Sequence, residues 1–69
     1  MSSTKRSITI AGHRTSVSVE DEFWEALSEI ADEDDSSIAR LVETIDQSRG
    51  EKSLSAAIRA FVLRKARSG

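Results

Sequence analysis

The first part of the chain alternates between apolar and polar residues. Residues 7–19, SITIAGHRTSVSV, follow this period of two and are rich in β-branched side chains, as strands are. Gly12 interrupts the alternation, so we predict a β-ribbon strand or a β-hairpin over 7–19. A two-residue turn with glycine first would lie at Gly12 and His13. It would pair Ile10 with Thr15, Ile8 with Val17, and Arg6 with Val19.

The same alternation gives the predicted hairpin two unlike faces, because successive side chains point to opposite sides of a strand. One face is apolar and collects Ile8, Ile10, Val17 and Val19. The other face collects Ser7, Thr9, Arg14, Ser16 and Ser18. The pattern therefore predicts a wholly polar surface along one side of the hairpin.

After Val19 the apolar spacing changes to three and four residues, which is typical of amphipathic helices. We predict helices over 20–33, 36–48 and 53–66. Asp35 or Ser36 suits the start of the second helix, Gly50 suits a left-handed stop, and Ser53 suits the start of the third. The apolar stripes are Phe23, Ala26, Leu27, Ile30 and Ala31; Ile38, Leu41, Val42 and Ile45; and Leu54, Ala57, Ile58, Phe61 and Val62. A strand or hairpin followed by helices is an α+β domain.

The length of the chain limits the core that one copy can build. Sixty-nine residues without proline or repeats predict a single domain over 1–69, which buries about 60% of its unfolded surface. The sequence has no cysteine and one histidine, so neither disulfides nor a metal is expected to support it. Oligomerisation is the remaining candidate, and we predict a homodimer.

Phe23 and Trp24 are adjacent on the predicted first helix and therefore point about 100° apart. Burying both side chains requires an unusually wide apolar face, so we expect one of them to meet another chain. The alternative is that Trp24 lies at the rim of the core of its own chain.

The net charge of −2 argues weakly against a nucleic-acid partner, but the charges are unevenly distributed. Residues 1–19 carry three basic residues and no acid, a charge of +3. Residues 20–51 carry all 12 acids and two basic residues, a charge of −10, and residues 52–69 carry five basic residues, a charge of +5. Both ends can therefore meet phosphate, whereas the middle cannot.

Catalysis and metal binding find little support in the residues present. His13 has no cysteine or second histidine as a partner and is better interpreted as a turn residue. The acids at 32–35 lack the spacing and the glycine of a calcium loop, so they are interpreted as a solvated turn. No apolar run is long enough to cross a bilayer, and the N-terminus lacks a secretory signal. We expect a cytoplasmic protein that is no enzyme and has no cofactor, metal, membrane partner or small-molecule substrate.

The stretch RTSVSVEDEFWEALSEIA, and the opening ITIAGHRTSVS followed by FW, resemble the ribbon-helix-helix DNA-binding family, especially a short bacterial group. The resemblance covers nearly the whole chain. In that family two chains pair one strand each into an antiparallel ribbon, which enters the DNA major groove while the helices interlock as the dimer core. The resemblance implies an intertwined α+β homodimer with an N-terminal strand or hairpin and two to three helices.

The resemblance also implies roles for individual residues. Arg14, Ser16 and Ser18 match the outward strand positions and are expected to contact bases, since arginine can bind guanine through two hydrogen bonds and serine can bond either base edge. Contacts with phosphate are expected from Lys5, Arg6, Lys52 and Ser53. The third helix is favoured as the phosphate clamp because acids flank the start of the second. The expected dimer core is Val17, Val19, Phe23, Trp24, Leu27, Ile30, Leu41, Ile45, Ile58 and Phe61.

Sequence-specific binding of double-stranded DNA by a transcriptional regulator or repressor is therefore the leading hypothesis. The alternative is a homodimeric protein-interaction module that uses its acidic central helices and does not bind DNA. Clustering of Arg14 with Lys5 and Arg6 beside the same residues of the second chain of the dimer would favour DNA, whereas an exposed apolar patch ringed by acids would favour a protein partner.

Overall fold

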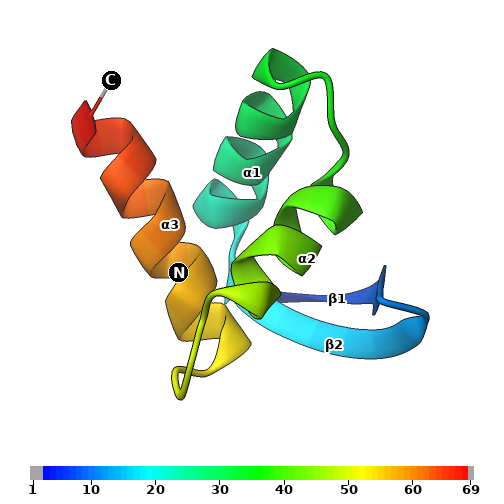
Figure 1. The fold of residues 1–69 in the computed structure, drawn as a ribbon. Helices are drawn as coiled ribbons and strands as arrows, with labels where there is room; N and C mark the ends of the chain where they lie inside the picture. The colour runs from blue at the N-terminus through cyan, green and yellow to red at the C-terminus, as the bar shows by residue number, and fades with distance from the viewer. Residues whose placement is uncertain (1–2, 69) are drawn as a thin grey trace.

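Two antiparallel strands followed by three helices make up the fold (Figure 1). The computed structural model describes residues 3–68. The elements are β1 (Ser3–Ile10), β2 (His13–Glu20), α1 (Asp21–Glu33), α2 (Ile38–Gln47) and α3 (Leu54–Ser68). The expected α+β order, a hairpin and then helices, is confirmed, and the chain forms all three predicted helices.

The hairpin turn lies at Ala11 and Gly12, one residue before the predicted position. The two residues have φ angles of 51° and 84°, and positive φ at both central residues is the mark of a type I′ turn. The predicted turn with glycine first, at Gly12 and His13, is therefore wrong. The pairing moves by two residues, so that Ile10 lies opposite His13, Ile8 opposite Thr15, and Arg6 opposite Val17.

A shift of two residues leaves every side chain on its predicted face, because the faces of a strand alternate with a period of two. Ile8, Ile10, Val17 and Val19 are buried on the face that we call the inner face. In Figure 1 the hairpin lies beneath α1 and α2, so the helices cover the inner face and leave the opposite face open. The predicted division of the hairpin into an apolar and a polar side is confirmed.

α1 follows β2 directly and ends in an acidic turn. In this turn Asp35 has a φ of 55°, and the Ser36 N–H donates to the Ala31 carbonyl at 2.7 Å. α2 is then capped by Ser37, whose hydroxyl accepts the Arg40 N–H at 3.2 Å. The predicted cap at Asp35 or Ser36 is therefore wrong by one or two residues, because Asp35 serves to end α1.

One core joins the hairpin to all three helices. Leu27 of α1, Val42 of α2 and Ile58 of α3 are wholly covered and belong to the same cluster as the inner face. Burying a large aliphatic side chain contributes about 1.5–3 kcal/mol to folding. The margin of the cluster is formed by partly buried Phe23, Ile38, Leu54, Phe61 and Val62.

Trp24 is covered by its own chain and is only 2% exposed. Its indole N–H donates to the Thr4 carbonyl at 2.9 Å, and the Arg6 guanidinium lies 5.1 Å from the ring centre. Phe23 is half-buried, with the Arg59 guanidinium 5.9 Å from its ring centre. Groups of the same chain thus pack on both aromatic rings, and burial of Trp24 does not require a second chain.

α3 is 15 residues long, and its last two turns extend beyond the core. Every side chain from Leu63 to Ser68 is exposed. Within residues 3–68, none of the helices has both the length and the apolar character that a membrane span needs.

Candidate nucleic-acid interface

The polar side of the hairpin, which we call the outer face, is formed by both strands. It consists of Lys5, Ser7, Thr9, Arg14, Ser16 and Ser18, all of which are exposed. Lys5 lies opposite Ser18, Ser7 opposite Ser16, and Thr9 opposite Arg14. The structure therefore brings the three predicted base-contacting residues together with one predicted phosphate-contacting residue on one surface.

Lys5 and Arg14 place the two positive charges of the outer face toward its opposite ends. Lys5 pairs with Ser18, which lies four residues beyond Arg14, so about 13 Å of strand separates the two cations. Hydroxyl groups occupy the remaining positions of these three pairs, and the next pair on this side of the hairpin, Ser3 and Glu20, contains an acid. Such a surface offers cationic donors at both ends and adaptable hydroxyl donors and acceptors over its whole length.

β2 ends at Glu20, whose carboxylate is held by Arg59 of α3. The Nε and Nη2 groups of Arg59 donate to Oε1 and Oε2 of Glu20 at 2.9 and 3.3 Å. This side-chain bond is the main reason that the pKa of Glu20 is lowered; a backbone hydrogen bond and the Arg59 charge act in the same direction, and desolvation opposes them. The acid nearest to the outer face is therefore ionised, but it is paired with a cation.

Arg6 does not lie on the outer face. It pairs with Val17 on the inner face, and its guanidinium stacks on Trp24. The alternation of the strand thus separates Arg6 from Lys5 and Arg14. A contact between Arg6 and phosphate would have to be made from the opposite side of the hairpin. Within one chain, Arg6 does not cluster with Lys5 and Arg14, the arrangement that would favour DNA.

Lys52 and Ser53 lie in the loop that leads into α3. The Ser53 hydroxyl caps α3 by accepting the Ala56 N–H at 3.2 Å, as predicted from its position. Lys52 is exposed, and its carbonyl accepts the Arg49 Nη1–H at 2.7 Å. The structure fixes the backbone of this loop, and contact with phosphate by either side chain stays a prediction.

β2 has a free edge, because β1 borders it on one side only. In an antiparallel hairpin with a two-residue turn, every second residue of a strand directs its backbone groups away from the partner strand. In β2 these residues are Arg14, Ser16 and Ser18, so the outer-face side chains and the free backbone groups come from the same positions. Ser55 of α3 occupies one end of this edge, since its hydroxyl donates to the Ser18 carbonyl at 2.9 Å.

Two further contacts hold the hairpin on the helices. At the turn, the Ala11 N–H donates to the Glu43 carboxylate of α2 at 3.0 Å. At the open end, the Thr4 hydroxyl donates to the carboxylate of Asp21. These contacts orient the outer face, and they join residues 32 and 17 positions apart, so no local spacing in the sequence signals them.

Most residues predicted for a dimer core are buried inside the single chain. Those buried are Val17, Val19, Trp24, Leu27, Ile30, Leu41, Ile45 and Ile58. Phe23 and Phe61 are half-buried. One copy therefore possesses a core of its own, and the contribution of these residues to a dimer stays a prediction.

A family model described as a ribbon-helix-helix domain matches residues 3–66. The chain belongs to the ribbon-helix-helix family. Ribbon-helix-helix domains are generally found in DNA-binding transcription regulators, and the match includes both strands of the hairpin and all six residues of the outer face. The resemblance in the residue pattern is thus confirmed for the family and for the fold.

A solved structure has the same fold as this ribbon-helix-helix chain. It is an uncharacterized protein from Bordetella pertussis Tohama I, with 34% sequence identity and a TM-score of 0.79. The match covers 94% of this chain and 56% of that one, so the chain spans little more than half the length of this neighbour. A comparison with curated proteins gives no significant match.

Proposed function

We propose that this chain binds double-stranded DNA through the outer face of its hairpin and acts as a transcriptional regulator, without catalysis. One observation carries the proposal: the hairpin is a two-stranded antiparallel ribbon with one face on the helices and an exposed polar face opposite, at whose end the one acid, Glu20, is paired with Arg59. The major groove of B-DNA is about 12 Å wide and admits a ribbon of two strands. Membership of a family of DNA-binding regulators supports the same function.

Both strands of the proposed ribbon come from one chain. In the family resemblance each of two chains supplies one strand, whereas here β1 takes the place beside β2. Strands lie about 4.8 Å apart, so four strands joined at two β2 edges would span more than the width of the groove. Ser55 also occupies part of the β2 edge. We therefore propose a homodimer whose chains meet through their helices.

Within the proposed complex the outer-face residues divide into two groups. Arg14 is best suited to bind guanine, because its planar guanidinium can donate two parallel hydrogen bonds to O6 and N7. Ser16 and Ser18 bond base edges next to it and discriminate less sharply. Lys5, at the other end of the ribbon, binds phosphate as a point charge.

The test is binding of the chain to duplex DNA over a range of salt concentrations. The logarithm of the affinity should fall linearly with the logarithm of the salt concentration, since phosphate neutralisation releases counterions. Arg14→Ala should weaken binding to a selected site by about 1–3 kcal/mol and relax the preference at one base pair. The matched control is Arg40→Ala, an exposed arginine of α2, which should leave binding unchanged.

Lys52→Ala distinguishes anchoring from base recognition. It should weaken binding to selected and random DNA about equally and lower the salt slope by roughly one phosphate. Equal losses for Arg14→Ala and Arg40→Ala would show that only net charge matters and would reject base recognition by the ribbon. If no variant changes binding, the DNA proposal fails and a protein-interaction module becomes the better account.

A further inference from the structure

Glu20 is the one acid on the outer side of the hairpin. The sequence has no acid before it, and it follows Ser18 by two positions, so it lies on the same side of β2 as the outer face. Ser18 is paired with Lys5 across the hairpin. Glu20 is therefore the diagonal cross-strand neighbour of Lys5, at a Cα spacing of about 7–8 Å that long side chains can bridge.

A carboxylate in this position can compete with DNA for Lys5. The ammonium group of Lys5 is the cation that the proposed complex places on phosphate at this end of the ribbon. An ion pair between Lys5 and Glu20 would neutralise that cation, and one phosphate contact would be lost. Among the described residues 3–68, Glu20 is paired with Arg59 instead, and none of the ion pairs found there includes Lys5.

Arg59 holds the Glu20 carboxylate in a geometry that a lysine cannot offer. Its Nε and Nη2 groups donate to the two carboxylate oxygens at 2.9 and 3.3 Å. A planar guanidinium matches a carboxylate through two parallel hydrogen bonds, whereas an ammonium group acts as a point charge. The Arg59 guanidinium also lies 5.9 Å from the centre of the Phe23 ring, which restricts where it can point. In competition for Glu20, Arg59 is therefore favoured over Lys5.

A second side chain of α3 helps to place the end of β2 beside Arg59. Ser55 lies one helical turn before Arg59, and its hydroxyl donates to the Ser18 carbonyl at 2.9 Å. Four residues of a helix rise about 6 Å, and two residues of a strand rise about 6.6 Å. Side chains one turn apart on α3 can therefore bond residues two apart on β2, and Glu20 is presented to α3.

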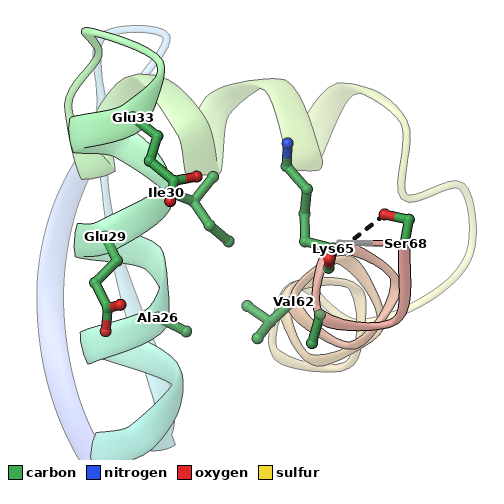
Figure 2. Close-up of a pocket in the computed structure, with 8 residues that line it drawn as sticks. Ala26, Glu29, Ile30, Glu33, Val62, Lys65 and Ser68 are labelled. Carbon is green, nitrogen blue, oxygen red and sulfur yellow. Dashed lines mark hydrogen bonds between the residues drawn. The ribbon is translucent and has the colours of Figure 1, made fainter.

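The pairing of Arg59 with Glu20 is not a general result of opposite charges on neighbouring segments. Farther along α3, Lys65 lines a groove of about 500 Å³ together with Glu29 and Glu33 of α1 (Figure 2). No ion pair found within residues 3–68 crosses this groove. The contact is therefore a specific feature of the end of the ribbon.

We propose that Arg59 is a positioning residue of the DNA interface: it withholds the Glu20 carboxylate from Lys5 and so keeps the Lys5 ammonium free to bind phosphate. Arg59 itself does not contact DNA. This inference rests on the proposed function, which assigns phosphate binding to Lys5. It adds that a residue of α3, outside the outer face, sets the strength of that contact.

Titrations of Arg59→Gln with duplex DNA of random sequence test the inference. Glu20 would then pair with Lys5, so the affinity should fall by about five- to tenfold near 0.1 M salt, and the salt slope should fall by roughly one phosphate. The matched control is Arg67→Gln, which removes the same charge from an exposed position about 12 Å farther along α3. Because salt screens charges at that distance, it should change the affinity by less than about twofold.

Two double variants separate positioning from a direct contact. Glu20→Gln combined with Arg59→Gln removes the competing carboxylate, so the affinity and the salt slope should return to those of Glu20→Gln alone. Lys5→Gln combined with Arg59→Gln should bind within about twofold of Lys5→Gln alone, because no ammonium remains to be neutralised. A direct bond between Arg59 and phosphate predicts the opposite: no rescue in the first double variant and a further loss in the second.

Glu20→Gln alone tests whether the ion pair has a purely structural role. This variant breaks the same ion pair and should be less stable near neutral pH, yet it should bind DNA at least as tightly as the unmodified chain, since Lys5 stays free. A structural role predicts that stability and DNA affinity fall together. Urea unfolding and DNA titration of the same preparation give both values, and they keep the inference testable even if Arg59→Gln does not fold.

Four results would overturn the proposal. They are an Arg59→Gln variant that binds DNA like the unmodified chain, a Glu20→Gln variant that binds it more weakly, a failed rescue by Glu20→Gln, and a further loss in the Lys5→Gln background. Any of them, with DNA binding by the unmodified chain intact, rejects this inference alone. If the unmodified chain does not bind DNA, the proposed function fails and this inference fails with it.

Discussion

Ala11 adopts a backbone conformation that is unfavourable for a residue with a Cβ atom. Its φ of 51° lies in the left-handed region, which costs most L-residues roughly 1–2 kcal/mol. The type I′ turn requires it, because positive φ at both central positions matches the twist of the two strands. The N–H of Ala11 is bonded to Glu43, which helps to fix this conformation.

We predict that Ala11→Asn stabilises the chain by about 0.5–1 kcal/mol, because asparagine is favoured before glycine in this turn. The side chain of Ala11 is exposed, so no packing is lost. Urea unfolding of both proteins measures the difference. In the control Ala39→Asn, on the exposed side of α2, the same change should destabilise by a few tenths of a kcal/mol or more, since asparagine is a poorer helix former.

A second prediction at this scale concerns Glu20 and Arg59. Because the hydrogen bond from Arg59 lowers the pKa of Glu20 in the folded chain, the pair stabilises the fold above the unfolded pKa of about 4.3. This contribution is lost as the pH falls through the lower folded pKa. Glu20→Gln should therefore be less stable than the unmodified chain near neutral pH, and the difference should shrink in acid. Glu51→Gln, at an exposed loop position, is the control; a similar pH dependence there would exclude the ion pair as the cause.

At the scale of elements, the period of the apolar residues was sufficient to predict the hairpin and the three helices. The period of the apolar residues could not locate the turn. A turn at Ala11–Gly12 and a turn at Gly12–His13 both leave each strand side chain on the same face of the hairpin. The choice depends on the twist of the strands and on the bond to Glu43, neither of which the spacing contains. The start of α2 was misplaced for a similar reason, since Asp35 and Ser36 both resemble caps but are used to end α1.

The candidate site was predictable to the same degree. Alternation correctly put Arg14, Ser16 and Ser18 on one exposed face, whereas the expectation that Arg6 contacts phosphate together with Lys5 ignored the same alternation. Stacking of Arg6 on Trp24 depends on how α1 packs against β1. Contacts of this kind between distant segments leave no local pattern in a single sequence.

Leu41 and Phe61 both belong to predicted apolar stripes, but the structure buries them to different degrees. Leu41 of α2 is buried, whereas Phe61 of α3 is half-buried at the margin of the core. Leu41→Ala should cost about 2–5 kcal/mol of unfolding free energy. Phe61→Ala should lower the unfolding free energy by less than the same substitution at a fully buried phenylalanine, because part of the Phe61 ring is exposed to water. Guanidinium unfolding of both variants tests the order, and a larger loss for Phe61→Ala would show that a second copy covers it.

At the scale of the whole molecule, the charges divide the chain into two basic ends, residues 1–19 and 52–69, and an acidic middle, residues 20–51. A homodimer, as proposed, links folding to association. We predict that the unfolding midpoint rises with protein concentration, by about 1.4 kcal/mol of apparent stability for each tenfold increase. Thermal unfolding at about 1 and about 100 µM measures this, and an unchanged midpoint would show that one copy folds independently of its partner.

The separation of the hairpin into two faces also has a consequence for how the protein can evolve. Residues that build the core alternate one by one with exposed residues that lie outside it, so mutations at Arg14, Ser16 or Ser18 are expected to change the stability of the fold little. Duplicated copies of the gene could therefore exchange these side chains freely while keeping Val17 and Val19. Under the proposed function, single substitutions could change the DNA preference while every intermediate sequence still folds.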